Sequence, residues 1–133
     1  MALQRFMLKG FARFARREQI PGSALTGAVD RLAGGFVDAN LGGNLVKQRV
    51  ARPGAGRSGG WRTIIVYRAP ELAVFVHGFA KNATGNVSQK ELMELKRLAG
   101  VMLELTPRQI RALGGNGAWI ELSEYDDDET LQE

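Results

Sequence analysis

Apolar positions near the start of the chain recur every three or four residues, which is the period of an amphipathic helix. One such stripe within the first seventeen residues predicts a helix, with a short strand over residues 2–6 as the alternative; its members are Leu3, Met7, Phe11 and Phe14. Pro21-Gly22 ends this segment. A second stripe, ended by Gly34-Gly35 or shortly after, consists of Leu25, Ala28, Val29, Leu32 and Phe36. Together the two segments predict a helical hairpin.

From residue 45 the apolar period changes to two, as in strands. Residues 45–50 alternate, residues 61–68 are rich in β-branched and aromatic side chains, and residues 72–79 are apolar on both faces. A strand that is apolar on both faces belongs in the centre of its sheet. Residues 118–122 are expected to form a last edge strand. The pattern therefore predicts an antiparallel sheet of about four strands.

Two capping-box sequences mark further helix starts, namely Ser88-Gln89-Lys90-Glu91 and Thr106-Pro107-Arg108-Gln109. The predicted fold class is α+β: an N-terminal helical hairpin packed on a twisted antiparallel sheet of about four strands, followed by C-terminal helices. Residues 1–122 are predicted to form a single domain. Residues 121–133 hold seven carboxylates and no base, so residues 123–133 are predicted to be an acidic, disordered tail.

Composition excludes several kinds of chemistry. A chain of 133 residues without cysteine has no disulfide framework, no Cys-ligated zinc and no thiol nucleophile, and its single histidine excludes a two-histidine metal motif. The longest apolar run, Leu72 to Val76, is too short to cross a membrane. We therefore predict a cytoplasmic protein with no metal, no cofactor and no membrane partner.

The charge is distributed unevenly along the chain. Residues 1–68 contain twelve Lys/Arg and three Asp/Glu, whereas residues 69–133 contain six and eleven. Between Asp38 and Glu71 there is no carboxylate, but this block contains Lys47, Arg49, Arg52, Arg57, Arg62 and Arg68. Such a block generates a strong positive potential, whose natural partner is a polyanion.

The basic block also has a pattern. Lys47 and Arg49 share one face of a predicted strand, and Arg62 lies on the next strand, after a glycine-rich loop that carries Arg57. Paired strands bring such side chains close together. Like charges clustered in this way cost stability unless an anion completes the site. The clustering therefore predicts that one phosphate is bound tightly.

Three other motifs have weaker functional readings. Gly54, Gly56 and Gly59 spell a dinucleotide fingerprint, but their loop joins two strands instead of opening a helix. His77 alternates with Phe75 and Phe79, which favours a histidine in the core or at its margin, with acid or base catalysis as the alternative. Trp61 and Tyr67 share a strand face, where they could stack on bases or pack in the core.

The sequence resembles the RelE/HigB branch of type II toxins over roughly residues 6–105. The resemblance is carried by five segments: Phe11 to Arg17, Ala39 to Gly43, Lys47-Gln48-Arg49, Arg57 to Arg62 and Gly78 to Asn82. It implies a ribosome-dependent mRNA endonuclease with a cognate antitoxin as its partner, and with the ribosome and mRNA as its targets. The resemblance specifies no oligomeric state.

The resemblance also assigns site residues. Lys47, Arg49 and Arg62 match basic active-site positions of RelE-like toxins, and Lys81 matches a basic position at the end of the last core strand. Asn82 stands where some relatives have a second arginine, no tyrosine lies near Ser88, and the histidine set of other HigB toxins is absent. The expected RNA contacts are Arg52, Arg57, Tyr67, Arg68 and Asn82.

A metal-independent mechanism follows as a hypothesis. Arginines stay charged and bind phosphate in a bidentate manner, so Arg49 and Arg62 are the expected transition-state clamps. Neighbouring cations favour the neutral form of a lysine, so Lys47 or Lys81 could transfer the protons, with His77 as a further candidate. The alternative function is a non-catalytic growth inhibitor, either a gyrase inhibitor like the ParE relatives or a plain RNA-binding module.

Overall fold

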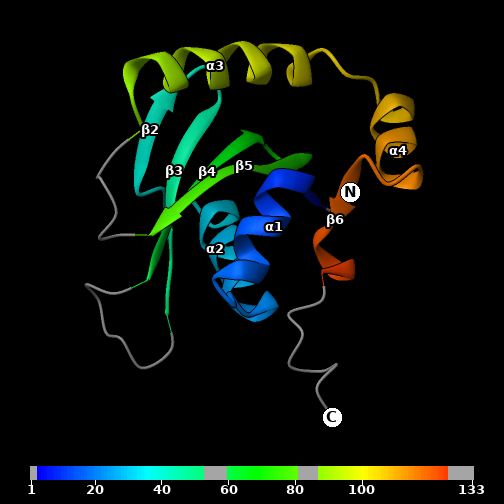
Figure 1. The fold of residues 1–133 in the computed structure, drawn as a ribbon. Coiled ribbons are helices and arrows are strands. Elements are labelled where there is room, and N and C mark those ends of the chain that lie inside the picture. Colours follow the sequence, from blue (N-terminus) through cyan, green and yellow to red (C-terminus); the bar gives the residue numbers. More distant parts are fainter. Residues whose placement is uncertain (1–2, 53–59, 81–86, 126–133) are drawn as a thin grey trace.

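A computed structural model describes residues 3–52, 60–80 and 87–125 of the chain (Figure 1). The elements in chain order are β1 (Gln4–Leu8), α1 (Lys9–Arg17), α2 (Gly22–Ala33), β2 (Ala39–Gly42), β3 (Leu45–Val50), β4 (Trp61–Arg68), β5 (Leu72–Ala80), α3 (Gln89–Leu103), α4 (Pro107–Gly115), β6 (Trp119–Glu121) and a 3-10 turn (Leu122–Glu124). In the part of the chain described, no helix is both long and apolar enough to cross a membrane.

The strands form one mixed sheet in the order β2-β3-β4-β5-β1-β6. Neighbouring strands are antiparallel except β1 and β5, which run parallel. The α+β class is therefore confirmed, and so are the central place of β5 and the edge strand β6. The predicted sheet of about four strands is wrong, because the described residues form six, and so is a purely antiparallel sheet.

The helical hairpin does not come first in the chain. Residues 4–8 are a strand, close to the alternative reading of residues 2–6, and the helix begins only at Lys9. Phe6 and Met7 explain why: they are adjacent, almost fully buried, and belong to two separate apolar clusters. A strand inside a sheet covered on both faces can bury consecutive side chains in opposite directions, whereas a helix with one apolar stripe cannot.

Strand β2 was not expected from the sequence. Its residues, Ala39–Gly42, have low strand propensity, since glycine and asparagine are depleted in strands. It forms because the chain turns back tightly onto β3 through Gly42, Gly43 and Asn44, whose φ angles of 88°, 62° and 67° are all positive. Such angles favour glycine and asparagine over other residues.

Helices cover both faces of the sheet (Figure 1). On one face α1 and α2 pack over residues such as Val46, Ile65 and Phe75. On the other face α3 and α4 contribute Ala99, Met102 and Ile110 to a second cluster, which also contains Ile64 and Val74 of the sheet. Both C-terminal helices begin at their predicted capping boxes, with Ser88 and Thr106 as the N-cap residues.

The folded domain extends further towards the C-terminus than expected. Ser123 and Glu124 belong to the 3-10 turn, and the side chain of Tyr125 is buried in the α1–α2 cluster. The Tyr125 hydroxyl donates a hydrogen bond of 2.7 Å to the carbonyl of Ile20. A disordered tail starting at residue 123 is therefore wrong for these three residues, because one buried aromatic ring attaches them to the core. Residues 126–133, including the Asp126–Asp128 run, lie outside the described residues.

Candidate nucleic-acid interface

The register of two neighbouring strands, β3 and β4, brings the predicted cations together. Arg49 of β3 lies directly opposite Arg62 of β4, and Lys47 lies opposite Ile64, two residues further along. Residues that face each other across paired strands project to the same side of the sheet. Since Ile64 belongs to the α3–α4 cluster, Lys47, Arg49 and Arg62 lie on that same face. We call this side of the sheet the basic face.

The three cations line one hollow. It measures about 400 Å³ and is bounded by Asp38, Ala39, Lys47, Arg49 and Arg62. We call it the basic hollow. This volume lies within the range of small-ligand sites, so the hollow can admit one phosphate together with part of its nucleotide. The expected convergence of Lys47, Arg49 and Arg62 is therefore observed.

Arg62 has an unusual environment in this hollow. Its Nη1 atom is buried and has no hydrogen-bond partner among the described residues. Buried polar groups in folded proteins are almost always paired, because leaving a charged donor unpaired costs free energy. A phosphate oxygen would supply the acceptor, and a guanidinium binds two such oxygens with suitable geometry.

A buried amide holds the rim of the hollow in place. Gln48, between Lys47 and Arg49 on the opposite face of β3, is fully buried. Its Nε2 donates to the carbonyls of Ala28 at 3.2 Å and Phe36 at 2.9 Å, and its Oε1 accepts the backbone N–H of Asp38 at 3.0 Å. All of these bonds join β3 to α2 and the loop that follows, so they fix the approach of residue 38 to the hollow.

The backbone of Arg49 is held from two sides. Its N–H donates to the Asp38 carboxylate, and its carbonyl accepts from the guanidinium of Arg31 in α2. The segment that carries Arg49, one of the two expected clamps, is thus held in place by contacts within the protein. Such preorganisation is what lets a site stabilise developing charge without reorganising.

A β-bulge determines where His77 lies. Ile64 pairs with His77, but the next residue, Ile65, pairs with Phe75, so Val76 is an extra residue in β5. An extra residue shifts the alternation of side chains between the two faces. As a result, Phe75 and His77 lie on opposite faces, although they are two residues apart.

The surroundings of β5 agree with this shift. Phe75 stacks on Phe11 of α1, with ring centroids 4.8 Å apart. Gly78 also faces α1, since a Cβ there would lie 2.5 Å from the Phe14 ring. His77 and its neighbour Phe79 therefore face the other way, onto the basic face. The alternation of residues 75, 77 and 79 in the sequence would put His77 on the same face as Phe75, and this expectation is wrong. The expected position of His77 at the margin of the core is confirmed by its half-buried side chain.

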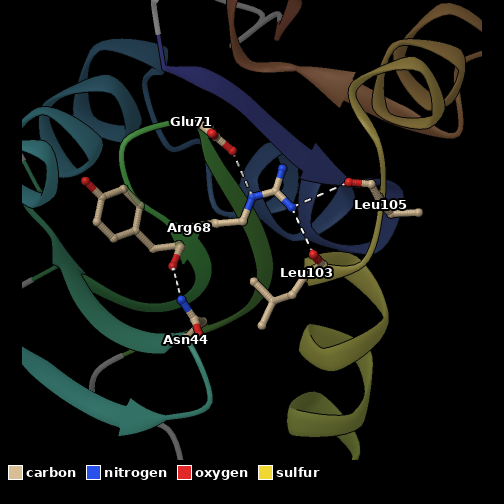
Figure 2. A network of polar contacts seen from close by, with 6 residues as sticks. Asn44, Arg68, Glu71, Leu103 and Leu105 are labelled. Atoms are coloured by element: carbon tan, nitrogen blue, oxygen red, sulfur yellow. Dashed lines mark hydrogen bonds and ion pairs between the residues drawn. The ribbon is translucent and has the colours of Figure 1, made fainter.

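Arg68 lies apart from the basic hollow. Its Nη1 donates to the carbonyls of Leu103 at 3.0 Å and Leu105 at 3.5 Å (Figure 2). Its Nε lies 3.2 Å from a carboxylate oxygen of Glu71, as an ion pair without hydrogen-bond geometry. The expected RNA contact is not supported for Arg68, because its guanidinium instead ties the end of α3 to the sheet.

The remaining predicted contacts divide into three groups. Tyr67 and Trp61 share a face as expected, but it is the α1–α2 face, where Trp61 is buried and its Nε1 donates to Glu18 at 3.0 Å. Tyr67 is thus separated from the basic hollow. Arg52 is exposed, and its guanidinium lies over the Trp61 ring at 4.9 Å. Arg57, Lys81 and Asn82 lie outside the described residues.

The sequence reasoning missed Asp38 and Gln48. In the sequence, Asp38 stands out only as the boundary of an acid-free block. Gln48 carried a detectable signal, because it is the one polar residue on the strand face that it shares with Val46 and Val50. A polar side chain at an apolar position of a strand usually marks a buried hydrogen-bond network.

The fold and this hollow define a small basic protein whose mixed sheet carries converging cations on one face. Comparison with known families then identifies the class: the model of the RelE toxin of the RelE/RelB toxin–antitoxin system matches residues 4–122. The chain belongs to the RelE toxin family. Toxins of this family generally inhibit translation and pair with antitoxins. No curated protein matches the chain.

Proposed function

We propose that this RelE-family toxin is a ribosome-dependent mRNA endonuclease whose reaction centre is the basic hollow. The observation that carries the proposal is Arg62, whose buried Nη1 atom has no partner among the described residues in a hollow also lined by Lys47 and Arg49. Scattered cations would suffice for general attraction to RNA. A single hollow with a buried, unpaired guanidinium nitrogen suits one phosphate held in a fixed geometry.

RNA cleavage by the neighbouring 2′-hydroxyl makes three demands on a protein. The hydroxyl must lose its proton, the additional negative charge on the phosphate must be stabilised, and the departing 5′-oxygen must gain a proton. Arg49 and Arg62 meet the second demand as transition-state clamps, since their charge is permanent and their position is fixed by the strands. The cations supply the positive charge that a metal would otherwise provide.

Two described residues are candidates for the donor of the 5′-oxygen proton. Lys47 lines the hollow, and His77 lies on the same face, opposite Ile64 and diagonal to Arg62. Diagonal neighbours across paired strands have Cα atoms about 7–8 Å apart, within reach of long side chains. Lys81 remains a third candidate, because it matches a basic position of the family in the sequence. Replacing each with alanine and measuring single-turnover cleavage identifies the donor.

The proposed RNA contacts outside the hollow are the predicted residues that no contact in the described structure rules out. Arg52 stays among the proposed contacts because the residue is exposed. Arg57 and Asn82 stay because they belong to the segments that resemble the family. Tyr67 and Arg68 are removed from the set, since the first faces α1 and α2 and the second is occupied by carbonyls of the chain. The cytosol, where ribosomes translate, is the proposed site of action.

Mapping of mRNA 5′ ends in a translation reaction, with and without the protein, tests this function. We expect new 5′ ends confined to ribosome-loaded message, and none with Arg62→Ala at the same protein concentration. Inhibited translation with intact message would contradict the proposal and favour a non-catalytic inhibitor. Inhibition of gyrase supercoiling by the same preparation, without any cleavage, would favour the ParE-like alternative.

A further inference from the structure

Asp38 introduces a negative charge into a hollow otherwise lined by cations. The carboxylate lies at the rim with Lys47, Arg49 and Arg62, and it is the one acidic side chain among the lining residues. A carboxylate repels phosphate, so its place beside a phosphate-binding cluster weakens anion binding unless it has a separate task. Phosphate binding by Arg49 and Arg62 therefore does not explain why Asp38 lies in the hollow.

The Asp38 carboxylate is positioned but not neutralised. Its Oδ2 accepts the backbone N–H of Arg49, and its own N–H is held by the buried Gln48 side chain at 3.0 Å. Within the residues that the structure describes, the carboxylate forms no ion pair, whereas Asp30 of α2 lies 2.9 Å from Arg5. An ion-paired carboxylate is a poor proton acceptor. Among the described residues, Oδ2 is the Asp38 oxygen that accepts a hydrogen bond, which leaves Oδ1 to accept another.

We propose that the carboxylate of Asp38 is the general base of the reaction, an assignment that rests on the proposed function. Arg49 and Arg62 are proposed to hold the reacting phosphate. The 2′-hydroxyl lies next to that phosphate, and it can donate a hydrogen bond to a carboxylate. A carboxylate at the rim is attracted to that hydroxyl and repelled by the phosphate, so it selects the proton that has to leave.

The step balances in atoms and charge. The 2′-oxygen passes its proton to Oδ1 of Asp38 and forms a bond to phosphorus, while the bond between phosphorus and the 5′-oxygen breaks. The 5′-oxygen takes a proton from the acid, for which Lys47 and His77 are the described candidates. The products are a 2′,3′-cyclic phosphate and a 5′-hydroxyl end. Exchange with water then restores Asp38 and the acid.

Single-turnover cleavage of a defined message on ribosomes tests the assignment. We expect Asp38→Asn to lower the rate by about a hundredfold to ten-thousandfold, the range for loss of a general base. The asparagine oxygen can still accept the Arg49 N–H, so ribosome co-sedimentation and the thermal midpoint should stay close to wild type. Asp38→Glu, which keeps a carboxylate at a shifted position, should fall between the two. Asp30→Asn, an exposed aspartate away from the hollow, is the matched control and should cleave normally.

Two further readouts separate a general base from a residue that only positions Arg49 and from the general acid. Loss of a catalytic carboxylate removes the acidic limb of the pH–rate profile, so Asp38→Asn should be independent of pH where wild type slows by protonation. A substrate with sulfur in place of the bridging 5′-oxygen has a leaving group that needs no proton. That substrate should rescue the acid variant but leave Asp38→Asn slow.

The outcomes distinguish this assignment from the function on which it rests. Wild-type cleavage together with an equally active Asp38→Asn would overturn the assignment of the base and leave the nuclease intact. Rescue of Asp38→Asn by the sulfur substrate would overturn it as well, since Asp38 would then act at the leaving group. Absence of wild-type cleavage would overturn the proposed function and the base with it.

Discussion

Gln48 and Asp38 are joined by a hydrogen bond of 3.0 Å from the Asp38 backbone N–H to the Gln48 side-chain oxygen, which connects a fully buried amide to the rim of the basic hollow. Neighbouring bonds from Gln48 reach Ala28 and Phe36. Residue 48 therefore contributes to stability and to the geometry of the site at once, although its side chain faces away from the hollow.

Replacement of Gln48 by leucine should lower the free energy of unfolding by roughly 2–4 kcal/mol. The change leaves the buried carbonyl of Ala28 and the partly buried backbone groups of Phe36 and Asp38 without their partner. A buried unpaired group costs about 1–3 kcal/mol, and a partly buried one costs less because water can reach it. Chemical denaturation measures the effect. Gln89→Leu, at an exposed position of α3, is the control and should change stability by less than about 0.5 kcal/mol. Equal effects of the two substitutions would show that the Gln48 network is not stabilising.

Arg62→Ala should reduce cleavage on the order of a hundredfold or more, the scale for loss of one transition-state donor. Ribosome co-sedimentation should weaken far less, with a salt slope lower by about 0.7 for one lost contact to a single strand. Arg62→Lys should not restore full activity, because a point charge lacks the bidentate fork. Arg5→Ala, whose guanidinium pairs with Asp30, is the control for a change of charge. Parallel losses of binding and cleavage would mean that Arg62 only attracts RNA.

Arg68 and Arg52 should behave differently when each is replaced by methionine. Arg68→Met removes the hydrogen bonds to Leu103 and Leu105, so it should lower stability by about 1–3 kcal/mol and leave the salt dependence of RNA binding unchanged. Arg52→Met should reduce the salt slope by about 0.7 with a small effect on stability. Thermal unfolding and binding at several salt concentrations check both. A lower salt slope for Arg68→Met would return that residue to the RNA-binding set.

Gly78→Ala should destabilise the protein by about 1–3 kcal/mol, because the added methyl group would lie 2.5 Å from the Phe14 ring in a packed layer. Gly100→Ala in α3 is the matched control. A Cβ at that position meets no atom within 4 Å, so this change should stabilise the helix by about 0.5–1 kcal/mol. Thermal midpoints that move in the same direction for both variants would contradict the close packing of α1 on β5.

The C-terminus offers a test of where folding ends. Removal of residues 126–133, which contain Leu131 as their one large apolar residue, should leave the thermal midpoint nearly unchanged. Removal of residues 123–133 should lower it by many degrees, since the buried ring of Tyr125 is lost as well. Tyr125→Phe isolates the hydrogen bond to Ile20 and should cost about 1 kcal/mol. Indistinguishable midpoints for the two truncations would mean that Tyr125 does not contribute to the core.

Local chemistry was sufficient to predict several parts of this protein. The capping boxes at Ser88 and Thr106 act within four residues, so their helices begin where the sequence indicates. The apolar run of β5 places that strand inside the sheet irrespective of the partners on either side. The alternation of Lys47, Gln48 and Arg49 is a property of any strand, and it put two cations of the hollow on one face.

Only the tertiary structure decided the rest, because the deciding contacts join distant segments. Residues 4–8 became a strand since β5 and β6 were available to pair with them. The bulge at Val76 moved His77 onto the basic face, and an extra residue in one strand exists only relative to its partner. Asp38 is held at the hollow by a hydrogen bond to Gln48, ten residues away in the sequence. Tyr125 is held in the core by a hydrogen bond to the carbonyl of Ile20, 105 residues away. The periodicity of apolar positions predicts which side chains are buried. Strand register and long-range hydrogen bonds determine which of these side chains contact one another.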